Sequence, residues 1–179
     1  MTSREEIISD WIVERKRWGL NDWVLRFSNQ KRQLGYCKPR SRVISISLAF
    51  MITNPYSVMR DTLLHEIAHA LHYMKTGKTN HDNGWREIAK RVGCRPERCA
   101  SGEELQMPRG KYIGVCPSCG KTVQFYRKVR RSYSCNECGR GYDSRYRLRI
   151  IPAEKYDADR WTSIAKQQVL PFYPKKKRV

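Results

Sequence analysis

The stretch DTLLHEIAHALHYM, residues 61–74, holds three of the chain's four histidines within eight residues. Residues four apart on an α-helix project from the same side of the helix about one turn apart, so His65 and His69 can face one point. One metal ion can then bind both imidazoles, and Glu66 can reach a water molecule beside the ion. The stretch therefore predicts a helix that carries an H-E-x-x-H metal site.

Catalytic zinc usually takes a third protein ligand, and two further histidines are available. His72 shares the helix and lies too far along its axis to reach the same ion as both His65 and His69. His81 follows a turn at Gly77 and can approach from another direction, so His81 is the expected third ligand and His72 is expected on the helix face near the site. Alternatives as ligands or supporting partners are Asp61, Asp82 and Cys94.

The surrounding patterns predict a mixed α+β domain over residues 1–108. Ser3 and Glu6 form a capping box for a helix over residues 3–18. Strands are expected over 23–27 and 42–48, the second with one buried and one exposed face because apolar and polar residues alternate. Further helices are expected over residues 55–75 and 81–93, and residues 94–108 are expected to be a linker.

Paired cysteines mark a second domain, expected over residues 109–150. Cys116, Cys119, Cys135 and Cys138 follow the pattern C-x2-C-x15-C-x2-C, which is typical of a structural zinc site closed by four thiolates. We expect a small β zinc ribbon whose hairpin is formed by residues 122–134. The remaining thiols lack partners at ligand spacing and are interpreted as buried or incidental; they are Cys37, Cys94 and Cys99.

The formal charge of +19, from 36 Lys+Arg against 17 Asp+Glu, favours a polyanionic partner, and nucleic acid is the expected one. Basic residues in the second domain alternate with aromatic residues that can stack on bases. The candidate nucleic-acid contacts are Lys121, Arg127, Lys128, Arg130 and Arg131, interleaved with Phe125, Tyr126 and Tyr133.

Residues 151–179 form a C-terminal segment with two short motifs. The terminal PKKKRV is typical either of a nuclear-import signal or of a basic tail that holds nucleic acid. QQVLPF, residues 167–172, is similar to peptides that bind sliding clamps, with Gln167, Val169, Leu170 and Phe172 in matching places; the alternative is an apolar patch that packs on the ribbon.

The N-terminus is charged and no apolar run of about 18 residues occurs, so neither a signal peptide nor a membrane span is expected. We expect a soluble, monomeric, cytoplasmic and nucleoid-associated protein, or a nuclear one in a eukaryote.

HEIAH followed by HDNGW, and preceded by RQLGYC and RVISIS, resembles the SprT-like metallopeptidases, which include the Spartan proteases, over about residues 5–140. The resemblance implies a zincin-like domain in which His65, His69 and His81 hold zinc and Glu66 is the catalytic base. Trp85 matches the aromatic residue four positions after the third histidine. Many members have glycine directly after that histidine, whereas this chain has Asp82 there and glycine at 84.

The resemblance further implies cleavage of proteins bound to DNA or crosslinked to it, with one catalytic and one structural zinc ion. Zinc would activate water, Glu66 would take its proton, and the strand over 42–48 would be the sheet edge that pairs with substrate. Two alternatives are a catalytically silent zinc-ribbon protein that binds nucleic acid and a metal-dependent nuclease. Glu66 argues against the first, and the imidazole-rich ligand set argues against the second.

Overall fold

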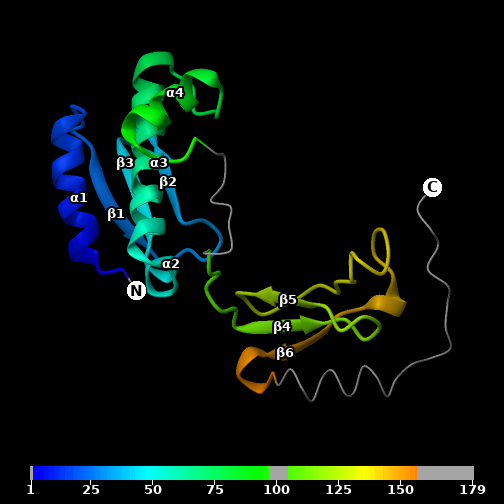
Figure 1. Cartoon of the computed structure of the whole chain (residues 1–179). Coiled ribbons are helices and arrows are strands. Elements are labelled where there is room, and N and C mark those ends of the chain that lie inside the picture. Colours follow the sequence, from blue (N-terminus) through cyan, green and yellow to red (C-terminus); the bar gives the residue numbers. More distant parts are fainter. Residues whose placement is uncertain (1, 97–104, 157–179) are drawn as a thin grey trace. The chain divides into compact units, whose positions relative to one another are not determined.

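The computed structural model describes residues 2–96 and 105–156 (Figure 1). The chain divides between Pro108 and Arg109 into two compact units, and the mixed α+β class expected from the sequence is confirmed. Cys99, the clamp-like motif and the basic tail lie outside the described residues. No helix in the described part is long and apolar enough to cross a membrane.

The described residues of the first unit, 2–96 and 105–108, contain four α-helices, three strands and one short 3₁₀ turn. The helices are α1 (Arg4–Arg17), α2 (Leu48–Thr53), α3 (Tyr56–Thr76) and α4 (Asn83–Val92). The strands are β1 (Val24–Ser28), β2 (Gly35–Lys38) and β3 (Val43–Ser47), with the 3₁₀ turn η1 at Pro39–Ser41.

The ends of the helices follow from local sequence. Ser3 and Glu6 form the expected capping box at the start of α1. Helix α3 ends at Gly77, whose φ of 71° lies in the left-handed region that glycine enters without a steric penalty. Asp82 caps α4 by accepting a hydrogen bond from the backbone N–H of Trp85. His81 therefore lies just outside α4, in the connection from α3.

The order of strands in the first sheet is β1-β3-β2, with β3 parallel to β1 and antiparallel to β2. The prediction that residues 42–48 form a sheet edge is therefore wrong, because β3 is the central strand. All five residues of β3 are buried, so the expected exposed face is absent as well. Ser47 donates a hydrogen bond to the carbonyl oxygen of Gln30, which satisfies one of the two serines in this buried strand. The edge next to α3 is β2, which the sequence analysis missed.

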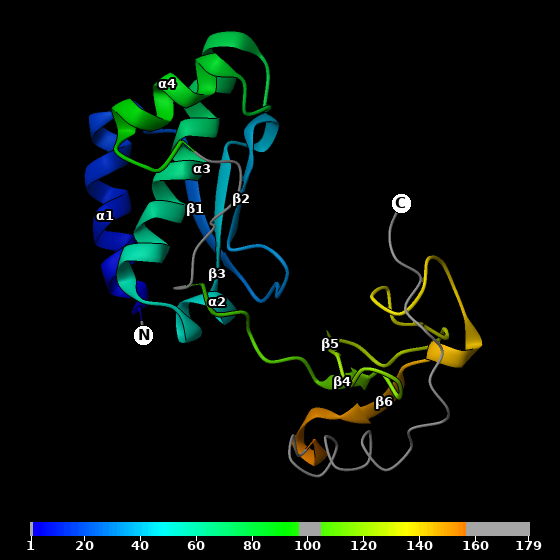
Figure 2. The same ribbon diagram turned by 45° about the vertical axis from the view of Figure 1, so that its right-hand side comes forward.

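The core of the first unit forms between the sheet and the helices, of which α1 and α3 lie side by side (Figure 2). Its members come from α1, β3, α3 and α4 and include Ile7, Trp11, Ile44, Ile46, Leu63, Ile67 and Trp85. The central part of α3 is thus held against the sheet. This packing fixes which side chains of α3 point toward β2.

Part of the expected linker belongs to the first unit. Leu105 packs on the core, and the backbone of Gln106 accepts from the side-chain amide of Asn54 at 2.8 Å and donates to its oxygen at 2.8 Å. Asn54 is 1% exposed, so this pair of hydrogen bonds is a buried anchor. Residues 105–107 are therefore a strap on the domain surface.

The second unit is a three-stranded antiparallel sheet of order β5-β4-β6. Its strands are β4 (Tyr112–Val115), β5 (Thr122–Phe125) and β6 (Arg149–Pro152), with 3₁₀ turns η2 at Ser144–Tyr146 and η3 at Ala153–Lys155. The predicted hairpin over 122–134 is wrong, because only its first four residues form a strand and that strand pairs with β4. Strand β6 also runs past residue 150, the domain boundary expected from the sequence.

Candidate metal centres

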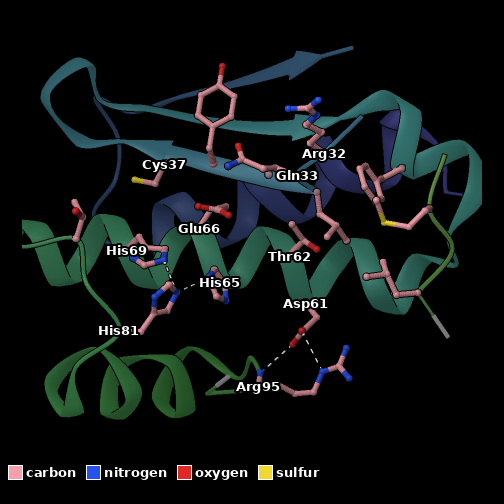
Figure 3. A pocket seen from close by; sticks show the side chains of 17 residues that line it. Arg32, Gln33, Cys37, Asp61, Thr62, His65, Glu66, His69, His81 and Arg95 are labelled. Carbon is pink, nitrogen blue, oxygen red and sulfur yellow. Dashed lines mark hydrogen bonds and ion pairs between the residues drawn. The ribbon is translucent and has the colours of Figure 1, made fainter. Parts of the chain in front are cut away.

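Three histidine nitrogens converge at the side of α3 (Figure 3). Nε2 of His81 lies 3.0 Å from Nε2 of His69 and 3.1 Å from Nε2 of His65. A tetrahedral zinc ion with Zn–N bonds of 2.0–2.1 Å separates its nitrogen ligands by about 3.3 Å. The three nitrogens therefore fit one ion with shifts of a few tenths of an ångström, and the triad can bind a metal.

The environment of His65 and His69 favours their neutral forms. Burial, with a smaller contribution from the neighbouring histidines, lowers the pKa of His65 to about 4 and that of His69 to about 3. Neutral imidazoles offer the lone pairs that a metal needs. Trp85, which is fully buried, covers the triad with ring centroids 4.8, 5.2 and 4.4 Å from those of His65, His69 and His81.

Glu66 lies beside the triad at the junction of α3 and β2 (Figure 3). Its carboxyl group is buried, which raises its pKa to about 8, and a hydrogen bond from the backbone N–H of Cys37 opposes this rise. A cation among the three histidines would favour the charged carboxylate. Glu66 is therefore placed to exchange a proton with a molecule bound at the triad.

A cleft of about 550 Å³ surrounds these groups. One wall is β2 and the loop before it, the floor is the exposed side of α3, and Leu105 and Met107 of the strap contribute a further wall. Asp61, one turn before His65, accepts hydrogen bonds from the backbone N–H of Arg95 at 3.0 Å and from its Nε at 3.2 Å. The triad thus lies in an open cleft large enough for an extended segment of a polymer.

Gly35 allows β2 to approach α3 closely. A Cβ atom at this position would lie 2.9 Å from the carbonyl oxygen of Ser45 and 3.1 Å from both Cγ of Glu66 and Cγ2 of Thr62. Both backbone and side-chain atoms surround this position, so a shift of one side chain alone would not make room for a methyl group.

Gly35→Ala should therefore lower the free energy of unfolding by about 1–3 kcal/mol, the usual cost of overpacking, measured by denaturant titration. Lys38→Ala, an exposed change in the same strand, should stay within about 0.5 kcal/mol of wild type. Equal effects of the two changes would contradict the close approach.

Other candidates from the sequence take different places. His72 is buried and faces Asp82, with 3.1 Å between its Nε2 and Oδ1 of the carboxylate. Cys94 is buried and donates to the carbonyl oxygen of Ala89. Asp61, Asp82 and Cys94 therefore do not join the histidines as ligands. Cys37, interpreted as incidental, lines the cleft, and burial raises the pKa of its thiol.

A family model described as the SprT-like family matches residues 6–104, more than half of the 179 residues. The chain belongs to the SprT-like family. The match covers the three histidines, Glu66 and β2, and of the residues that line the cleft only Leu105 and Met107 follow the matched range. Neither the curated proteins nor the solved structures contained a significant match to the chain.

The second unit of this SprT-like protein brings its four paired cysteines together. Sγ of Cys116 lies 3.8 Å from Sγ of Cys138, and Sγ of Cys119 lies 3.6 Å from Sγ of Cys135. Zinc–sulfur bonds of 2.3 Å in a tetrahedron give a separation of about 3.8 Å. The cluster therefore has the dimensions of a four-thiolate metal site.

Basic residues of the second unit gather around a hollow of about 600 Å³. Arg130 and Arg131 line it as two of the predicted nucleic-acid contacts, together with Arg147, Arg149 and Tyr133. Lys121 is paired with Glu137 near the cysteines, and the exposed Arg127 and Lys128 are not part of the hollow. Arg147 and Arg149 were missed because β6 brings them back from 16 or more positions along the chain.

Proposed function

We propose that this SprT-like protein is a zinc-dependent endopeptidase with a zincin-like domain, and that it cleaves proteins bound or crosslinked to DNA. The observation that carries the proposal is the convergence of three histidine nitrogens beside the buried carboxyl group of Glu66 in one open cleft. Membership of the SprT-like family supports the same activity.

His65, His69 and His81 would hold the catalytic zinc ion. Zinc at this position supplies Lewis acidity to a water molecule and to a peptide carbonyl. Glu66 takes a proton from the attacking water and then delivers it to the leaving amine as the peptide bond breaks. Trp85 and the core behind it keep solvent from the far side of the triad.

The free edge of β2 is the surface on which a substrate backbone would pair. The backbone N–H of Ser47 in β3 donates to the carbonyl oxygen of Leu34 at 2.7 Å, so alternation turns the backbone groups of Gly35 and Cys37 away from β3. These groups face the cleft side, where the N–H of Cys37 meets Glu66. Pairing through the backbone would let the enzyme accept many sequences.

This arrangement predicts sensitivity to substrate backbone chemistry. N-methylation of one amide beside the scissile bond of a substrate peptide removes a donor to the β2 edge, and cleavage should fall about 10-fold, corresponding to one lost hydrogen bond. The measurement is a scan of singly methylated peptides against the parent peptide. Unchanged cleavage for every methylated position would argue against strand pairing.

DNA association is supported by the charge of +19 and by the arginine hollow. Arginine guanidinium groups bind phosphate oxygens, and the exposed Tyr133 offers a ring for a base. The double variant Arg147→Ala/Arg149→Ala should weaken DNA binding and reduce the slope of log K against log salt by about 2, since two phosphate contacts are lost.

Fluorescence anisotropy with labelled single- and double-stranded DNA at several salt concentrations measures this change. Lys121→Ala is the matched control, because Lys121 is engaged with Glu137, and its effect should be smaller. A larger effect of Lys121→Ala than of the double variant would indicate that DNA binds near the four cysteines rather than at the arginine hollow.

The experiment that tests the function uses a protein crosslinked to labelled DNA, incubated with the purified full chain while protein and DNA are both scored for cleavage. Peptide cleavage with intact DNA is the expected result. Cleaved DNA with intact protein would favour the nuclease. DNA binding with neither bond cleaved would favour the catalytically silent binding protein.

A further inference from the structure

A close polar contact outside the ligand set joins the helix of the first two histidines to the loop of the third. His72 on α3 is 1% exposed, and its Nε2 lies 3.1 Å from Oδ1 of Asp82, the residue directly after His81. The hydroxyl oxygen of Thr76 lies 3.4 Å from the same nitrogen. The contact bridges ten positions of sequence across the turn that ends α3.

The same carboxylate also fixes the start of α4. Oδ1 of Asp82 accepts a hydrogen bond of 3.0 Å from the backbone N–H of Trp85, and the Trp85 ring packs against all three histidine rings of the triad. Asp82 therefore links two buried side chains, His72 on one helix and Trp85 on the next, immediately beside a proposed metal ligand.

The segment that leads to His81 is exposed at every residue from 74 to 80. Within it, the hydroxyl of Thr76 donates a hydrogen bond of 2.8 Å to the carbonyl oxygen of His72. After this segment, Asp82 contacts the buried His72, and the buried Trp85 packs against His81. These contacts hold the chain on the C-terminal side of His81.

Gly84 leaves the space that the pair needs. A Cβ atom at this position would lie 3.3 Å from Oδ1 of Asp82 and 3.5 Å from Nε2 of His72. The absence of a side chain at Gly84 therefore leaves room for the contact between His72 and Asp82.

We propose that His72 and Asp82 are positioning residues that hold His81 in the geometry required for metal binding. The inference rests on the proposed zinc site, but its test measures metal affinity rather than peptide cleavage. The positioning role can therefore be refuted while the peptidase activity is observed, and it can be supported while no cleavage is observed. Mutation of a residue that is not itself a ligand but orients one typically lowers metal affinity by 10–100-fold.

The test measures zinc affinity of the full chain by competition with a chromophoric chelator. Two phases of zinc release are expected from wild type. The phase that is missing in His81→Ala is assigned to the histidine site. His72→Leu removes the polar nitrogen, and Asp82→Ser keeps a good helix cap with a side chain too short to reach His72. Each change should weaken zinc binding at the histidine site about 10-fold and leave the cysteine site unchanged.

Three comparisons complete the design. The double variant His72→Leu/Asp82→Ser should bind zinc about as weakly as either single variant, because both remove one contact. His72→Gln, which keeps a polar side chain, should recover most of the loss. Val58→Ala, a buried change on α3 away from the triad, should lower thermal stability without changing zinc affinity.

Zinc affinity within about twofold of wild type in either single variant would overturn the proposal, judged against the expected 10-fold change. Equal losses in His72→Gln and His72→Leu would also overturn it, since the lost packing of the ring rather than the lost polar contact with Asp82 would then be responsible. Losses that multiply in the double variant would show two independent effects and would likewise contradict a shared contact.

Discussion

Glu66→Gln should lower peptide cleavage by about 10²–10⁴-fold while the number of bound zinc ions stays the same. Glutamine has nearly the size and shape of glutamate and keeps an oxygen that can accept from the backbone N–H of Cys37. It lacks the carboxylate that takes and returns a proton. The measurement is the cleavage rate of a DNA-bound protein together with zinc per chain.

Asp61→Asn is the matched control for this variant. Asp61 is a second acid in the cleft, one turn earlier on α3, and its two carboxylate oxygens accept hydrogen bonds from Arg95. Its replacement should leave cleavage within about 10-fold of wild type, below the range for a lost general base. Equal losses in the two variants, or substantial cleavage by Glu66→Gln, would contradict the role of Glu66.

Cys135→Ser should remove one zinc ion and unfold the second unit. Cys135 and Cys116 are buried in a small cluster with Leu148, and the other cluster in the described part of the unit holds as buried residues only Ile113, Val115 and Ala153. Clusters of this size are too small to hold a domain folded without the metal. Structural zinc contributes about 10–16 kcal/mol in small zinc domains at neutral pH, more than such a core supplies. Zinc per chain, limited proteolysis and DNA binding measure the loss.

Cys94→Ser is the control that tests whether replacing a cysteine outside the cluster also causes loss of zinc and of DNA binding. Cys94 is buried in the first unit, where its thiol donates to the carbonyl oxygen of Ala89, and a serine hydroxyl can make the same contact. This variant should keep both zinc ions and DNA binding. Retention of two zinc ions by Cys135→Ser would mean that the cysteines are not a metal site.

The residues that the sequence proposed as metal ligands lie together in the structure, because their arrangement depends on spacing. Helical geometry brings His65 and His69 together wherever α3 packs, and two C-x2-C turns orient four thiolates locally. His81 could be chosen over His72 because one straight helix cannot bring three distant side chains to a single ion. These predictions needed only local structure and the number of available histidines.

The sheet could not be predicted to the same degree. The alternation in RVISIS is the same for a central and an edge strand, and the small serines of β3 tolerate burial. Strand β2 is four residues long, begins with glycine and gains its place only through pairing with β3. The strap at 105–107 depends on the buried amide of Asn54, which gives no periodic signal.

Contacts between distant residues explain the remaining differences. Arg147 and Arg149 join Arg130 and Arg131 because the chain returns beside this segment, where Arg147 pairs with Ser134 in an isolated β-bridge just before β6. His72 was expected to be a residue of the helix face, and its role with Asp82 depends on how α4 folds back over α3. A pattern in one segment does not carry this information.

The most direct test of the central claim is the cleavage rate of a DNA-crosslinked protein as a function of zinc bound per chain, starting from metal-free protein. Cleavage should appear as the histidine site fills, increase with DNA, and be absent from His81→Ala at every zinc concentration. No cleavage by the fully loaded chain with either single- or double-stranded DNA, or equal cleavage by His81→Ala, would contradict the account.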